Sequence, residues 1–216
     1  MISSGWMSTP TTSTMRVEKI QPSRHKKGRI LLFLEDGSLL KITEQELLDF
    51  GLRPGDQLDE EVLTRLRASA AGSDARAQAA AMIGRRAMSR RDLEQKLRDK
   101  GASAGDAAYA AEWLEAIGAL NDADYAALLV RHYAGLGYGP ARYREELRRH
   151  GIDRDLWEDA VAQAPDSGEL AEQYLRDRFR EKAPDEQERK RAAAALARRG
   201  FSWGDVKAAL RAWEEG

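Results

Sequence analysis

The sequence feature that most constrains the fold is an amphipathic helix, ended by glycine, that recurs along the chain. Gly101, Gly151 and Gly200 each follow such a helix, at spacings of 50 and 49 residues. Glycine readily takes the left-handed conformation that ends a helix. The buried positions of each predicted helix lie eight and four residues before its glycine: Leu93 and Leu97, Tyr143 and Leu147, Ala192 and Leu196. Self-similarity at a fixed period predicts a repeat protein.

Further helices are predicted on both sides of each glycine-ended helix. Two residues after each glycine stands a residue that can cap a new helix, namely Ser103, Asp153 or Ser202. Asp106 and Asp205 complete a capping box after the two serines. The first helix of each unit is predicted at residues 75–86, 122–134 and 169–180. Three-helix units have small cores, so we expect three stacked repeats that share buried faces in an elongated, curved array.

The N-terminal part of the chain has a β-type pattern instead. Residues 16–20 alternate between apolar and polar side chains, and residues 29–34 form a short apolar run. An Asp36-Gly37 pair then supplies a hairpin turn before a second apolar stretch at residues 39–42. Such an arrangement is typical of a β-hairpin.

Two short helices are predicted to complete this N-terminal module. Thr43 and Glu46 form a capping box for a helix that Gly51 ends, and residues 59–68 form another helix with one apolar face. The small polar residues 69–74 are interpreted as a linker. The predicted organisation is mainly α: a disordered tail (1–14), the β-hairpin and helix module (15–70), and three-helix repeats at 71–120, 121–165 and 166–216.

No motif in the sequence predicts catalysis, a cofactor or a metal site. The chain has no cysteine, which excludes disulfides, thiolate zinc sites and a cysteine nucleophile. His25, His132 and His150 stand alone, without a second ligand at metal spacing. The stretch Gly135 to Pro140 resembles a phosphate loop, but it follows a helix rather than a strand, so we interpret it as a helix connection. Its amides could still meet an acidic partner.

The apolar residues are too dispersed for a membrane protein. A membrane-spanning helix needs about 18 consecutive apolar residues, and no stretch approaches that length. We therefore expect a cytoplasmic protein without membrane contact.

The charge is balanced overall but alternates in blocks along the chain. The sequence has 35 basic and 36 acidic residues, for a net charge of −1. Residues 62–104 contain ten basic and four acidic residues, whereas residues 105–128 contain five acidic and no basic ones. A single block is usually a solvated helix face. Blocks that recur with the repeat would instead align into stripes and favour a binding surface.

Four stretches of the helical region share a joint spacing that is specific, although each stretch alone is weak. They read Arg86-x-x-Ser89-x-x-Asp92-Leu93-x-x-Lys96-Leu97-x-x-Lys100-Gly101, Gly118-x-Leu120-Asn121-Asp122-x-x-Tyr125-Ala126, Gly139-Pro140-x-Arg142-Tyr143-x-x-Glu146-Leu147-x-x-x-Gly151-Ile152, and Arg199-Gly200-Phe201-Ser202. Over residues 75–213 they resemble the RecX family of bacterial recombinase regulators. Asn121 departs from the acid usual there, Tyr143 from isoleucine, and His150 from lysine. The β module resembles the N-terminal extension of some members.

The resemblance implies a non-enzymatic regulator that binds the RecA recombinase, within the groove of its filament on single-stranded DNA. There it would restrain filament growth, ATP hydrolysis and strand exchange, acting as a monomer with at most weak DNA contact. We predict that the partner-binding residues are Arg85, Arg86, Arg90, Arg91, Arg131, Tyr138, Arg142, Arg144 and Arg148. An array with charged stripes could touch several subunits of a filament.

Two other functions remain open at this point. Three-helix units can resemble helix-turn-helix domains, so the basic blocks could bind DNA directly. The acidic blocks argue against this, because they would repel a continuous phosphate backbone. The chain could also be a passive helical adaptor for another protein.

Overall fold

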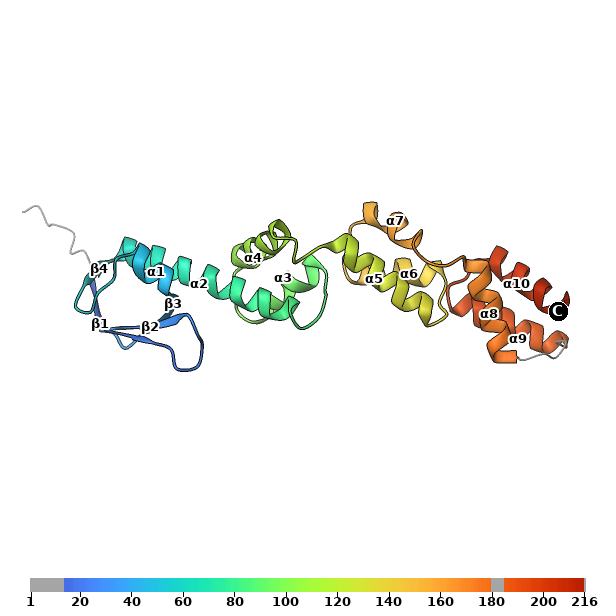
Figure 1. Cartoon of the computed structure of the whole chain (residues 1–216), viewed down its shortest axis with the longest axis horizontal. Coiled ribbons are helices and arrows are strands. Elements are labelled where there is room, and N and C mark those ends of the chain that lie inside the picture. Colours follow the sequence, from blue (N-terminus) through green and yellow to red (C-terminus); the bar gives the residue numbers. More distant parts are fainter. Residues whose placement is uncertain (1–13, 180–184, 216) are drawn as a thin grey trace, which may run out of the picture. The chain divides into compact units, whose positions relative to one another are not determined.

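The computed structural model describes residues 14–179 and 185–215, which are mainly helical (Figure 1). The chain divides into two compact units. The first contains the residues up to 78 together with 101–110, and the second contains residues 79–100 and 111–216. Almost all of the predicted disordered tail lies outside the described residues.

The first unit is built on a four-stranded antiparallel sheet in the order β3-β2-β1-β4. Its strands are β1 (Thr14–Pro22), β2 (Arg29–Leu34), β3 (Leu39–Thr43) and β4 (Gln57–Asp59). The predicted hairpin is confirmed, because β2 pairs with β3 and Gly37 between them has a φ of 78°. Sequence reasoning missed β4, since three residues are too few to show alternation.

Two helices complete the core of the first unit. They are α1 (Glu44–Asp49) and the first half of α2 (Glu60–Ile83). The predicted capping box of α1 is present: the Glu46 amide donates to Thr43 Oγ1 at 3.1 Å, and the Thr43 amide donates to Glu46 Oε2 at 2.7 Å. Leu63 and Leu66 of α2 are buried in the same cluster as the apolar sheet residues.

The predicted linker at residues 69–74 is wrong, because α2 runs through it without a break. Tertiary hydrogen bonds explain the difference. Arg29, only 8% exposed, donates from Nη1 to Ser73 Oγ at 2.8 Å and from Nη2 to the Ser73 carbonyl at 2.9 Å. Ser69 Oγ donates to Glu46 Oε1 at 2.8 Å. These contacts outweigh the roughly 1 kcal/mol that Gly72 costs inside a helix.

The helical repeats are confirmed. The C-terminal part of α2 is followed by α3 (Arg90–Asp99) and α4 (Ala104–Ala116). The second repeat contains α5 (Asp122–Gly135), α6 (Pro140–Arg149), a 3₁₀ turn (Arg154–Leu156) and α7 (Trp157–Val161). The third contains α8 (Ser167–Phe179), α9 (Glu186–Arg198) and α10 (Trp203–Glu215). Gly101, Gly151 and Gly200 all have positive φ, as the period predicts.

The middle helices α3, α6 and α9 supply the centre of each repeat. Their predicted inward positions are all at most 1% exposed: Leu93, Leu97, Tyr143, Leu147, Ala192 and Leu196. Burial raises the pKa of the Tyr143 hydroxyl to about 12, and this hydroxyl donates to the Tyr138 carbonyl. Among the described residues, no helix combines the length and apolar character that crossing a membrane requires.

Candidate partner-binding surface

The first joint between repeats connects the start of α3 to the end of α6. Ser89, which is fully buried, accepts the Asp92 amide at 3.1 Å as the cap of α3. The same hydroxyl donates to the His150 carbonyl at 2.6 Å. His150 Nδ1 in turn lies 2.6 Å from Asp92 Oδ2, and its ring packs edge-on against Tyr125. His150 is therefore a packed residue of this joint.

The second joint repeats this contact between the start of α6 and the end of α9. The Gly139 amide donates to the Arg199 carbonyl at 2.9 Å, and the Ala141 amide donates to the Gly200 carbonyl at 3.1 Å. A Cβ on Gly139 would lie 2.6 Å from the Gly200 oxygen, so the two backbones meet where only glycine fits.

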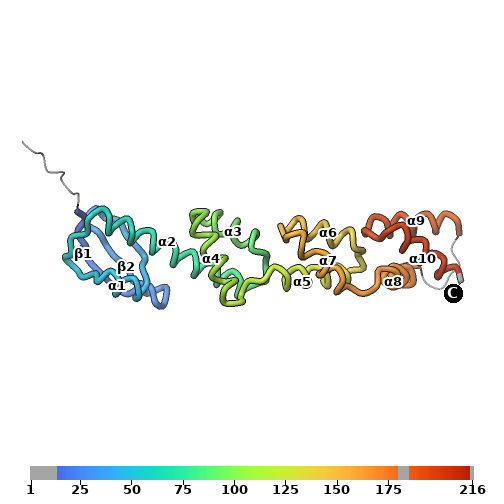
Figure 2. The backbone as a smooth tube through the Cα atoms, turned by 90° about the horizontal axis from the view of Figure 1, so that it is seen from above, coloured from blue at the N-terminus to red at the C-terminus, as the bar shows by residue number. Residues whose placement is uncertain are grey.

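Both joints therefore place the end of one middle helix against the start of the preceding one. In Figure 2, α3, α6 and α9 follow one another along the second unit. The negative end of each helix dipole meets the positive end of its neighbour, which is a favourable arrangement. This sequence of joints positions the predicted arginines.

The predicted arginines of the first repeat lie in the turn after α2 and on the first turn of α3. Arg85, Arg86 and Arg91 are exposed, and no carboxylate among the described residues lies within 4.0 Å of their nitrogens. Arg90 differs, because it pairs with Glu94 at 2.9 Å and also with Glu115. The hydrogen bond to Glu94 raises the pKa of Arg90. Three of these four side chains are thus available to a partner.

The predicted arginines of the second repeat also separate into paired and unpaired groups. Arg142 contacts Glu145 and the buried Glu146, both at 2.6 Å. Arg144 donates two hydrogen bonds to the Glu158 carboxylate, from Nε to Oε1 at 3.0 Å and from Nη2 to Oε2 at 2.9 Å. These bonds lower the pKa of the Glu158 carboxyl. The exposed side chains of Arg131 and Arg148 have no such carboxylate partner in the described part of the chain.

Tyr138 belongs to an internal stack rather than to an isolated aromatic contact. The guanidinium of Arg142 lies 5.8 Å from its ring centroid and that of Arg199 lies 4.9 Å away. Arg199 also stacks on Tyr174 at 4.5 Å and donates from Nη1 to the Leu136 carbonyl at 2.8 Å. Arg199 is not among the predicted binding residues, because Leu136, Tyr138 and Tyr174, which it contacts, lie far from it in the sequence.

The glycine-rich connection before α6 is a helix connection, as we interpreted it. Its amides already have backbone acceptors: Gly137 donates to Ala134 at 2.8 Å, and Gly139 donates to Arg199. The amides at these two positions are therefore not free to bind an anion.

Two hollows lie next to the turn after α2. The first, of about 330 Å³, brings Arg85 and Arg86 together with Lys96 and Lys100, two cations that the prediction omitted. Their four-residue spacing was the available signal, because it places Lys100, at the C-cap of α3, above Lys96 on the same side of the helix. The second, of about 350 Å³, is mostly apolar and contains Arg131. Within residues 14–179 and 185–215, no three His, Asp or Glu side chains are grouped to hold a metal.

Comparisons with known proteins agree on one family. Residues 121–161 match the second three-helix domain of RecX, and residues 166–210 match the third. The regulatory protein RecX of Xanthomonas axonopodis pv. citri is 39% identical over 132 residues, which cover 60% of this chain and 82% of that protein. The regulatory protein RecX of Stenotrophomonas maltophilia is 39% identical over 136 residues, covering 60% of this chain and 81% of that one.

Solved structures support the same fold. A crystal structure of regulatory protein RecX superposes with a TM-score of 0.69 at 24% identity, covering 89% of this chain and 97% of that one. RecX from Lactobacillus salivarius superposes with a TM-score of 0.60 at 20% identity, covering 68% and 98%.

Proposed function

Since this chain belongs to the RecX family of regulatory proteins, we propose that it binds the RecA recombinase filament on single-stranded DNA and restrains its growth, ATP hydrolysis and strand exchange. It acts by binding, without catalysing a reaction itself, as a monomer in the cytoplasm. The partner is the one that the family resemblance implies.

The observation that carries this proposal is the set of unpaired cations on successive repeats. Arg85, Arg86 and Arg91 on the first repeat, and Arg131 and Arg148 on the second, are exposed without a carboxylate within 4.0 Å among the described residues. Charges that no internal carboxylate neutralises are available to steer and bind an acidic surface.

The paired residues of the predicted site have a positioning role in this proposal. Arg90 and Arg144 hold α4 and α7 through their ion pairs. Arg142 and Tyr138 belong to the stack beside the second joint. We therefore assign direct filament contact to the unpaired arginines, and correct orientation of the repeats to the others.

The charge blocks favour a filament over bare DNA as the ligand. A RecA filament presents both protein and DNA, so acidic helices can face basic protein surface while the arginines face acidic groups. On bare DNA, the acidic block at residues 105–128 would meet phosphates.

The test is the ATPase activity of RecA on single-stranded DNA, measured with the full chain and with an Arg86→Gln/Arg148→Gln variant. We expect the full chain to lower the rate and the variant to need about tenfold more protein for the same effect. The matched control is Arg198→Gln/Arg211→Gln, which removes two exposed cations elsewhere.

An unchanged ATPase rate at severalfold excess of the full chain would contradict the proposal. Tight binding to bare DNA with a steep salt dependence, and without an effect on RecA, would instead support direct DNA binding.

A further inference from the structure

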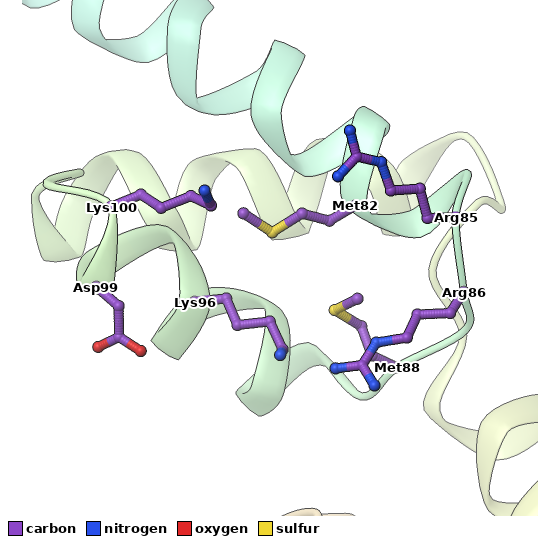
Figure 3. Close-up of a pocket in the computed structure, with 7 residues that line it drawn as sticks. All are labelled: Met82, Arg85, Arg86, Met88, Lys96, Asp99 and Lys100. Carbon is purple, nitrogen blue, oxygen red and sulfur yellow. The ribbon is translucent and has the colours of Figure 1, made fainter.

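The hollow between the end of α2 and α3 has a cationic rim around a thioether floor (Figure 3). Its volume is about 330 Å³, and its lining consists of Met82, Arg85, Arg86, Met88, Lys96, Asp99 and Lys100. That size lies within the range of pockets that enclose a small ligand or a side chain.

The four cations of the rim form no ion pair within residues 14–179 and 185–215. In the described residues, no carboxylate lies within 4.0 Å of Arg85, Arg86, Lys96 or Lys100. Figure 3 shows the nitrogen ends of Lys96 and Arg86 pointing toward the same space, while the carboxylate of Asp99 points away from it. Cations that converge without a counter-charge repel one another, so an anion bound between them is favoured.

The floor supplies an apolar surface of an adaptable kind. Met88 is 4% exposed and Met82 is half-buried, so both methionines pack against the rest of the chain. The turn above them is fixed by backbone bonds from the Arg85 and Arg86 amides to the Met82 carbonyl, at 3.2 and 3.3 Å. Methionine packs against many shapes of apolar side chain. The hollow is therefore preformed and combines an apolar surface with a cationic rim.

We propose that this hollow binds an acidic peptide segment of a partner protein, with one large apolar side chain against Met82 and Met88 and flanking carboxylates on the four cations. This proposal extends the proposed function, and it depends on that function only for the identity of the partner. The contact itself can be tested without that partner.

A peptide fits these observations better than a nucleic acid strand. Single-stranded nucleic acids bind where bases stack on aromatic rings, and the lining of this hollow contains no aromatic side chain. The cations surround an apolar floor, which suits a peptide with one apolar side chain between its carboxylates better than a continuous run of phosphates.

The experiment measures the fluorescence anisotropy of a labelled peptide, Gly-Ser-Asp-Glu-Asp-Phe-Glu-Asp-Ser-Gly, titrated with the full chain. Two control peptides replace phenylalanine with serine, or each acid with its amide. We expect either change to weaken binding about tenfold, because the apolar anchor and the charges each contribute. A ten-residue oligothymidylate serves as the nucleic acid probe.

Two variants of the protein locate the contact. Arg85→Gln/Arg86→Gln should weaken binding about tenfold, and Met82→Gln should abolish the preference for phenylalanine over serine. The control Arg198→Gln/Arg211→Gln should bind as the wild type does. Thermal melts identify any variant that fails to fold, and the control peptides test the proposal on wild-type protein alone.

Equal binding of all three peptides, or unchanged binding by both hollow variants, would overturn the proposal. Tighter binding of the oligothymidylate than of the phenylalanine peptide would also overturn it, in favour of a nucleic acid site. Peptide binding without any effect on RecA ATPase would sink the proposed function and leave this site standing. Inhibition of RecA that is equally strong with Arg85→Gln/Arg86→Gln and with the wild type would exclude this hollow as a contact with RecA, and would leave the proposed function to the other unpaired arginines.

Discussion

At the scale of single residues, Gly139 and Gly200 set the separation of the second and third repeats. A Cβ on Gly139 would lie 2.6 Å from the Gly200 oxygen, and a Cβ on Gly200 would lie 2.7 Å from the Arg142 amide nitrogen. Gly135 lies four residues before Gly139, in the last turn of α5, and a Cβ there would meet only open space. A methyl group would therefore clash with backbone atoms at Gly139 but would be accommodated at Gly135.

Gly139→Ala should destabilise the chain by about 2 kcal/mol, because the methyl group pushes two backbones apart and weakens their hydrogen bonds. Gly135→Ala is the matched control and should be neutral or slightly stabilising, since alanine favours a helix. Urea unfolding of both variants gives the comparison. Equal stability of the two would show that the second joint is not closely packed in solution.

Ser89 and Ser103 both cap helices, but only Ser89 also joins two repeats. Ser103→Ala should cost about 1 kcal/mol, the usual value of a cap. Ser89→Ala should cost about 2 kcal/mol, because it also leaves the His150 carbonyl without its buried donor. Thermal unfolding of the two variants measures the difference. A cost for Ser89→Ala no larger than that for Ser103→Ala would exclude a contribution from the joint.

What the sequence could predict at this scale was periodic or local. The buried pairs such as Leu93 and Leu97 follow from spacing, and the caps follow from residue type. The joints could not be predicted, because the Ser89 hydroxyl and its acceptor are 61 residues apart. For the same reason the contacts of Arg199 could not be predicted, since its acceptor Leu136 is 63 residues away. Pairing also separated the predicted arginines into free and internally bound groups, which composition does not reveal.

At the scale of elements, α2 shows how tertiary contacts override a local signal. Gly72 and Ser73 are typical of a linker, yet Arg29 and Glu46 hold this segment in a helix. One consequence is that removal of residues 1–70 would cut a helix rather than a linker. The sequence predicted both helical segments that became α2 but not the stretch that connects them.

Ala71 lies on the exposed side of this stretch. Substitutions at this position therefore distinguish a continuous helix from a flexible linker. In a continuous helix, Ala71→Pro should cost about 3 kcal/mol or more and Ala71→Gly about 1 kcal/mol. In a flexible linker, both variants would be nearly neutral. Circular dichroism during urea unfolding measures the stability and the helix content together, and a neutral Ala71→Pro would contradict a continuous α2.

Glu46 makes the first unit sensitive to acid. Burial disfavours its charged form, but hydrogen bonds from Thr43, Ser69 and Ser73 outweigh this and bring its pKa below the ordinary 4.5. Because the pKa is lower in the folded state, this contribution to stability is complete above the unfolded value. It is lost as the pH falls through the folded one.

Thermal melts between pH 3 and 7 should therefore show a loss of stability below about pH 4.5. Glu46→Gln should be less stable at neutral pH and should lose less on acidification, since its side chain does not titrate. An identical pH profile in wild type and variant would assign the acid sensitivity to other carboxyls.

At the scale of the whole molecule, the near-neutral net charge hides two kinds of arginine. One kind is satisfied internally and sets the positions of helices, as Arg144 does through Glu158. The other kind, such as Arg86 and Arg148, has no internal partner among the described residues. A balanced composition is thus compatible with local binding surfaces, because its acidic residues neutralise only some of its cations.

The joints should also determine how far the repeats act together. In a repeat protein, stability is the sum of each repeat's own stability and its contacts with neighbours. Gly139→Ala weakens only the contact between α6 and α9, so it should speed amide hydrogen exchange in α9 and α10 and leave α3 unchanged. If the chain contacts the filament as we propose, the contact needs correctly oriented repeats, so the same variant should inhibit RecA less although every unpaired arginine is intact. Full inhibition combined with faster exchange in α9 and α10 would mean that the first two repeats suffice for binding.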